Sequence, residues 1–266
     1  MGESMRRLIA FDCAGDTLLG TLDEADGATG LLIVSGGNEI RVGAHRGQAL
    51  LAQAVAEAGH PVFRYDRRGI GDSEGVNGGF ESAAEDLAAA IATFRREAPH
   101  LTRIVGFGNC DAASTLALFG RDAGIDALIL ANPWVIEAQD VLPPPAAIRA
   151  RYAERLRDPA QWKRLLGGGV DLRKLAAGII RAAKPAKPSG LADRIAAGLD
   201  SFEGSIAILL ARNDNTAIVF DDAWRRQPFA ACRERCKPLM LDSASHSFAG
   251  ADDAAWLTSR VLDALA

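Results

Sequence analysis

The alternation of short apolar runs with longer amphipathic segments is the feature that most restricts how this chain can fold. Strands that are separated by helices pair in parallel, because each helix returns the chain to the edge where the previous strand began. The resulting sheet is covered by helices on both faces. The sequence therefore predicts an α/β protein with a mostly parallel, eight-stranded sheet.

Eight segments have the length and apolar content of strands, and the first two flank a short turn that predicts an opening hairpin. These segments are Leu8–Cys13, Thr17–Leu22, Gly30–Ser35, Pro61–Tyr65, Arg103–Phe107, Asp126–Leu130, Ser205–Leu210 and Pro238–Leu241. Helical spacing predicts helices between them. These helices cover Ala44–Ala58, Ser82–Arg96, Asp111–Leu118, Ala217–Cys232 and Asp252–Leu265.

One long segment does not follow this alternation. Residues 137–203 contain no convincing strand, and runs of proline and glycine interrupt them at Pro143–Pro145 and Gly167–Gly169. An all-helical insertion in a strand–helix series is typical of a cap, or lid, rather than of an independent domain. We therefore expect a core formed by residues 1–136 and 204–266, and a helical cap over residues 137–203.

Composition excludes several classes of protein. With 48% hydrophobic and 24% charged residues, the chain can bury a core, and its net charge of −4 argues against general nucleic-acid binding. No apolar run approaches the roughly 18 to 20 residues that cross a bilayer, and the apolar stretch near the N-terminus is too short for a signal peptide. We expect a cytoplasmic protein without stable membrane insertion, as a monomer or homodimer.

The four cysteines are too few and too scattered for a disulfide framework. Cys232 and Cys236 could share one face of a helix, but two thiols alone do not complete a zinc site. The sequence therefore predicts free thiols in a reducing compartment, with no metal and no cofactor.

Cys110 stands in a pattern that is typical of a nucleophile. The segment Gly108-Asn109-Cys110-Asp111-Ala112 lies between a predicted strand and a predicted helix. A nucleophile on such a tight turn has a strained backbone, so the residues two positions away must be small. The N-terminus of the following helix also favours a thiolate. A buried structural cysteine is the alternative interpretation.

His246 is the best candidate for the base that would act with Cys110. It lies in a loop after the last predicted strand, from which an imidazole can reach the same sheet edge as the thiol. A solvated loop histidine is the alternative. His60 and His100 precede strands at the opposite edge, so we expect both to be structural. His45 opens the first long helix near a glycine-rich loop and is a candidate for lining the site.

A carboxylate is needed to orient His246, and Asp214 is preferred because it directly follows a predicted strand. Asp221 and Asp222 are helical alternatives, and Asp242 is an alternative close to His246 in sequence. The order Cys110, Asp214, His246 is nucleophile, acid and base, as this sheet topology requires.

Two backbone N–H groups are needed to stabilise an oxyanion. One is expected from Asp111, and the other from the loop Gly36-Gly37-Asn38, where glycine allows the backbone to approach a substrate closely. A plain β-turn is the alternative interpretation of this loop. The segment Asp66–Ser73 is interpreted as scaffold, because its charged side chains can brace neighbouring loops.

These motifs together resemble the α/β-hydrolase superfamily over nearly the whole chain. More narrowly, Arg41–Arg46 and Gly108–Ser114 resemble the type 1 hydrolases associated with bacterial exosortase A systems. That resemblance implies genes that lie with exopolysaccharide production and protein sorting, and a cysteine where most α/β-hydrolases have serine. The chain departs from the commoner Gly-x-Ser-x-Gly pattern at Cys110 and Ala112.

The sequence thus predicts an ester or thioester hydrolase that works through a Cys–His–Asp triad on a small-molecule or carrier-bound acyl substrate. Activated esters, lactones and thioesters are favoured over amides, because a thiolate ejects poor leaving groups less readily. An acyltransferase with the same triad and a non-catalytic binding protein of the same fold are the alternatives. Trp134 is a further candidate for contacting substrate.

The predicted cap is basic. From Ala146 to Asp200 the chain has 12 Lys or Arg and 5 Asp or Glu residues, whereas the remainder has 18 and 29. Such a segment would attract an anionic substrate, an acidic carrier protein or an anionic membrane face, and Arg155 and Arg164 are the candidate contacts. A solvated helical face is the alternative.

Overall fold

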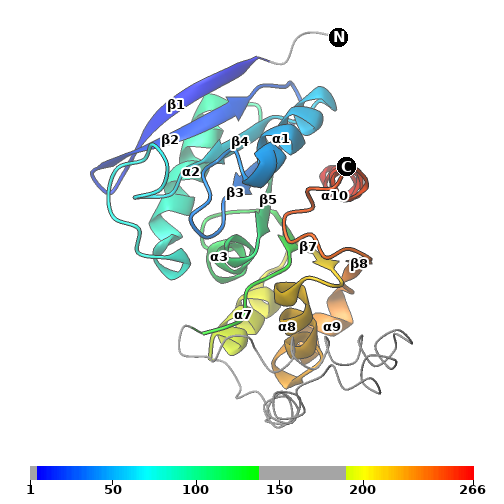
Figure 1. Cartoon of the computed structure of the whole chain (residues 1–266). Coiled ribbons are helices and arrows are strands. Elements are labelled where there is room, and N and C mark those ends of the chain that lie inside the picture. Colours follow the sequence, from blue (N-terminus) through cyan, green and yellow to red (C-terminus); the bar gives the residue numbers. More distant parts are fainter. Residues whose placement is uncertain (1–4, 138–189) are drawn as a thin grey trace, which may run out of the picture.

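The computed structural model describes residues 5–137 and 190–266, which form a sheet of eight strands with helices on both faces (Figure 1). The strand order is β1-β2-β4-β3-β5-β6-β7-β8. The strands are β1 (Arg6–Cys13), β2 (Asp16–Asp23), β3 (Thr29–Val34), β4 (Val62–Tyr65), β5 (Arg103–Asn109), β6 (Ala127–Ala131), β7 (Ser205–Ala211) and β8 (Leu239–Leu241). The predicted eight-stranded sheet is therefore confirmed.

The sheet is mixed, with its antiparallel pairs at one end. β1 and β2 form the predicted hairpin, whose turn is made by Ala14 and Gly15, both with positive φ. β2 is also antiparallel to β4, and every other pair, from β4 across to β8, is parallel. The carboxyl ends of β3, β5, β6, β7 and β8 therefore meet at one edge of the sheet, where a site can assemble.

Side chains alternate between two buried layers because strand residues point to opposite faces in turn. Leu31 and Ile33 of β3 pack with α1 (Gly47–Glu57) and α10 (Ala251–Leu265), whereas Leu32 and Val34 face the opposite layer. That layer contains α2 (Ala84–Glu97), α3 (Asp111–Phe119), α7 (Gly190–Ser201), α8 (Asn215–Trp224) and α9 (Ala230–Arg235). Figure 1 shows α1 and α10 side by side, as their contacts require.

Two predicted helices differ from the structure. The helix predicted over Ala217–Cys232 is wrong: α8 ends at Trp224, a short turn η3 (Gln227–Phe229) follows, and α9 begins at Ala230. Pro228 lies inside that turn, and proline lacks the N–H that a continuing helix needs. The helix predicted over Ala44–Ala58 begins instead with a short turn, η1 (Ala44–Arg46), because His45 and Arg46 have positive φ.

The segment Asp66–Ser73 braces loops, as its charge pattern predicts. Asp66 is fully buried, and its carboxylate accepts hydrogen bonds from the main chain of Arg41 (2.5 Å) and of Asp72 (3.3 Å) and pairs with the Arg41 guanidinium. Ser73 donates to the Asp66 carbonyl at 2.7 Å. The loop before α1 is therefore tied to the end of β4.

Most of the predicted cap lies outside the described residues, including Arg155 and Arg164. The last part of the predicted cap contains α7, which packs against α3 and contributes Leu191, Ile195 and Leu199 to the core. Among the helices of residues 5–137 and 190–266, none is long and apolar enough to cross a membrane.

Candidate active site

Cys110 lies on a sharp turn between β5 and α3. Its backbone has φ 62° and ψ −126°, a conformation that residues other than glycine rarely adopt. The turn is held on both sides: the Cys110 N–H donates to the Ala131 carbonyl (2.9 Å), and the Trp134 N–H donates to the Cys110 carbonyl (3.1 Å). A Cβ at Gly108 would lie 2.6 Å from the main chain of Ala112, so a small residue is required there.

His246 connects Cys110 to Asp214. The His246 Nδ1 and the Asp214 Oδ2 are 3.1 Å apart, and the Cys110 side chain lies close enough to the ring to influence its pKa. The hydrogen bonds to Asp214 and to Cys110 raise the pKa of His246 to about 10, although burial of the ring opposes this shift. The His246 ring is therefore positively charged at neutral pH, near the Cys110 side chain.

Asp214 is fixed by the helix that it begins. Its Oδ2 accepts hydrogen bonds from the N–H groups of Thr216 and Ala217, each at 3.0 Å, and so caps α8. The same oxygen faces His246, so the cap orients the carboxylate toward the imidazole. The structure therefore brings together Cys110, His246 and Asp214 from the ends of three different strands.

The three alternative carboxylates lie elsewhere. Asp221 pairs with Arg225 at 2.6 Å, one turn along α8, and Asp222 pairs with Arg226 in the same way. Asp242 accepts a hydrogen bond from the Asn213 side chain at 3.1 Å. Of the four candidate carboxylates, Asp214 is the one that is hydrogen-bonded to the His246 ring.

The Asp111 side chain binds the loop Gly36–Asn38, which the sequence predicts to bind an oxyanion. The Gly37 N–H donates to the Asp111 carboxylate at 2.6 Å, and the buried Arg67 guanidinium lies 4.0 Å from the same carboxylate. A Cβ at Gly36 would lie 2.6 Å from Asp111 Oδ1, so glycine permits this close approach. The Asn38 side chain accepts from Asn77 at 3.0 Å. A substrate oxyanion would have to displace the Asp111 carboxylate to reach the Gly37 N–H.

Replacing Asp111 by alanine should therefore increase acyl transfer. The change frees the Gly37 N–H and removes a negative charge from the residue next to Cys110, while the main-chain N–H of residue 111 remains. Because one oxyanion donor contributes about 10²- to 10³-fold in rate, a rise in kcat of about 10-fold is a conservative expectation. Steady-state kinetics on one acyl ester measures it, with Asp122→Ala as the control. A fall in kcat would show instead that the carboxylate holds the loop in its active position.

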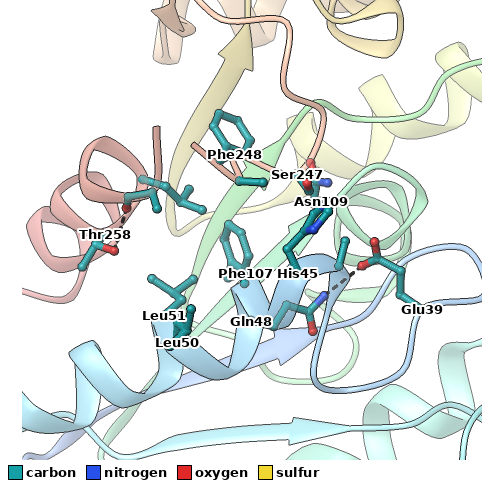
Figure 2. A pocket seen from close by; sticks show the side chains of 15 residues that line it. Glu39, His45, Gln48, Leu50, Leu51, Phe107, Asn109, Ser247, Phe248 and Thr258 are labelled. Carbon is teal, nitrogen blue, oxygen red and sulfur yellow. Dashed lines mark hydrogen bonds between the residues drawn. The ribbon is translucent and has the colours of Figure 1, made fainter. Parts of the chain in front are cut away.

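A cavity of about 150 Å³ is lined by Asn109 and by Ser247 and Phe248, which neighbour Cys110 and His246 in the chain (Figure 2). Its inner wall is apolar and comes from α1, β5 and α10, and its polar side includes Glu39, His45, Gln48 and Asn109. His45 thus lines a cavity beside the site. Trp134 is not among its lining residues: the indole donates to the Ile136 carbonyl at 2.6 Å and packs against the core.

Glu39 is a site residue that the sequence interpretation missed. Burial raises the pKa of its carboxyl, and the positive charge of His246 partly offsets that rise. Gln48 donates to Glu39 at 3.3 Å and accepts from the Ser35 hydroxyl at 2.9 Å. A single glutamate in a loop carries no spacing pattern, so only its burial and its place near His246 single it out.

A family model described as serine aminopeptidase, S33, matches residues 30–183. That match starts in β3 and includes the turn at Cys110. The chain belongs to the S33 serine aminopeptidase family. This S33 member has cysteine, not serine, on the turn between β5 and α3. A comparison with curated protein sequences finds no match.

Solved structures show that this S33 member has the α/β-hydrolase fold. The esterase Pf2001 of Pyrococcus furiosus superposes with a TM-score of 0.67 at 13% identity, over 98% of this chain and 92% of that one. A thioesterase domain from the curacin biosynthetic pathway gives 0.59 at 14% identity, over 97% and 99%. Est1E of Butyrivibrio proteoclasticus, solved with ferulic acid, gives 0.61 at 17% identity, over 96% of both chains.

Proposed function

We propose that this S33 family member is a cysteine-dependent acyl hydrolase that cleaves esters or thioesters. The observation that carries the proposal is the position of His246, whose ring is hydrogen-bonded to the Asp214 carboxylate and lies near the Cys110 thiol. Cys110 lies on the strained turn at the end of β5, and 40% of the His246 side chain is exposed, so a substrate can approach the pair.

In the proposed reaction the Cys110 thiolate attacks the acyl carbon, and the carbonyl oxygen becomes an oxyanion. The His246 imidazolium then gives its proton to the departing alkoxide or thiolate, which leaves an acyl-enzyme and a neutral imidazole. That imidazole next removes a proton from water. The resulting hydroxide releases the acid and restores the thiolate beside the imidazolium.

The Asp111 N–H is the proposed first donor to the oxyanion. It lies at the N-terminus of α3, where main-chain N–H groups have no partner within the helix and the helix dipole favours negative charge. Gly37 is the proposed second donor, once the Asp111 carboxylate has moved away. Asn38 is the third candidate, from the same loop.

Esters and thioesters are favoured over amides on chemical grounds. The tetrahedral intermediate can expel either the leaving group of the substrate or the Cys110 thiolate. Because the Cys110 thiolate is a good leaving group, an amine competes with it less well than an activated alkoxide or a substrate thiolate does. The solved neighbours named as an esterase and a thioesterase domain point to the same bond types. The exosortase association and the attraction of an anionic substrate by the basic segment remain predictions from the sequence.

The proposal is tested by turnover of paired acyl esters and acyl thioesters that share the same acyl chains. Hydrolysis of at least one pair is expected, with the leaving group of lower pKa giving the higher kcat/KM. Adding alcohol or amine acceptors distinguishes hydrolysis from acyl transfer by product analysis. Absence of turnover across the whole series, with no acylation of Cys110 by mass spectrometry, would argue for a non-catalytic binding protein.

A further inference from the structure

The main-chain carbonyl of His246 is held by two asparagine side chains. Asn109 Nδ2 donates to the His246 carbonyl at 3.0 Å, and Asn132 Nδ2 donates to the same oxygen at 3.1 Å. Asn132 Nδ2 also lies 3.2 Å from Asn109 Oδ1, so the two amides bind each other as well as the carbonyl. The contact is made at the backbone of His246, on the residue whose side chain joins Cys110 and Asp214.

The orientation of the Asn132 amide is determined by a third strand. Its Oδ1 accepts a hydrogen bond from the Ala211 N–H at 2.9 Å, at the end of β7. An N–H can only donate, so the oxygen must face Ala211 and the NH₂ group must face the two oxygen acceptors. Asn132 is fully buried and has φ 41°, a left-handed conformation that asparagine tolerates better than most residues.

The two asparagines connect the strand ends and the loop whose relative positions determine the geometry of the candidate site. Asn109 is the last residue of β5 and precedes Cys110, Asn132 follows β6, and Ala211 ends β7 three residues before Asp214. The network therefore links the strand ends that carry the nucleophile and the acid to the main chain of the base.

We propose that Asn109 and Asn132 are positioning residues for His246. By holding its carbonyl, they keep the imidazole between the Cys110 thiol and the Asp214 carboxylate. A shift of about 1 Å in the loop would break the hydrogen bond of 3.1 Å between His246 and Asp214. The two asparagine bonds to the His246 carbonyl therefore determine whether the ring stays in place. The inference rests on the proposed function, because it assigns these residues to the Cys110–His246 pair.

The test measures the reactivity of Cys110 without any substrate. The rate of Cys110 alkylation by iodoacetamide is followed from pH 5 to 10 by mass spectrometry of the peptide that contains it. At pH 6 the wild type is expected to react faster than His246→Ala, because the imidazole next to the sulfur assists its attack. In Asn109→Ala and Asn132→Ala the rate at pH 6 should fall about 10-fold, toward that of His246→Ala.

A matched control and a measurement of folding separate positioning from support of the core. Asn213→Ala removes an exposed amide that bonds to Asp242 and not to His246, so its profile should remain that of the wild type. Far-ultraviolet circular dichroism and Tm are recorded for every variant. If Asn132→Ala does not fold, Asn109→Ala decides the test, because the Asn109 side chain is only partly buried.

Two results would overturn the inference in distinguishable ways. Folded variants that have a lower Tm but the wild-type alkylation profile would show that the asparagines only satisfy buried main-chain groups. A wild-type alkylation rate that is unchanged by His246→Ala would overturn the proposed Cys110–His246 pair itself, and the inference with it.

Discussion

Replacing Cys110 by alanine is expected to lower the turnover of the best acyl ester or thioester by at least about 10³-fold, because the group that forms the acyl-enzyme is removed. The side chain is small and only partly buried, so the variant should keep the fold of the wild type. Steady-state kinetics measures the loss. Mass spectrometry of the protein mixed with substrate should show one acyl group on the wild type and none on Cys110→Ala.

The other three cysteines provide the control. Burial, assisted by the nearby Asp86 carboxylate, raises the pKa of Cys13 to about 11. Burial likewise raises the pKa of Cys232, and that of Cys236 to about 11. These thiols stay protonated at neutral pH and are poor nucleophiles. Cys236→Ala should therefore retain full activity, and wild-type turnover by Cys110→Ala would exclude Cys110 as the nucleophile.

Changing Asp214 to asparagine should lower kcat by about 10⁴-fold, as seen when the acid of a catalytic triad is neutralised. Asparagine is as good an N-cap as aspartate, so α8 should remain capped, whereas loss of the ion pair with His246 should lower the free energy of unfolding at neutral pH. The variant thus removes the charge that faces His246 while the helix stays in place. Asp221→Asn, in the same helix but paired with Arg225, is the matched control.

The pH profile gives this prediction a second readout. The pKa of His246 is raised to about 10, with the Asp214 hydrogen bond as its largest cause. The imidazolium is therefore present through neutral pH and is lost as the pH rises through about 10, so wild-type activity should decline on that alkaline side. Without the carboxylate charge the pKa of His246 falls, and the decline should move to lower pH. An unchanged alkaline decline in Asp214→Asn would contradict the assignment of Asp214.

The sheet, and the positions of most residues of the candidate site, are predictable because each depends on local sequence. Apolar runs of strand length mark eight strands, and the turn after β5 requires small residues at Gly108 and Ala112 around Cys110. The strand ends also place Asp214 and His246 at one edge. The helix predicted over Ala217–Cys232 is wrong, because Pro228 interrupts an otherwise helical pattern.

What the sequence determined by itself is the fold class and the order along the chain of the residues that we propose as nucleophile, acid and base. What only the tertiary structure decided are the contacts between distant segments: the Asp111 carboxylate on the Gly37 N–H, Glu39 near His246, and the two asparagine amides on the His246 carbonyl. These pairs are separated by many residues and follow no period. Their hydrogen bonds depend on how strand ends and loops lie in space, and a local pattern of residues does not contain that information.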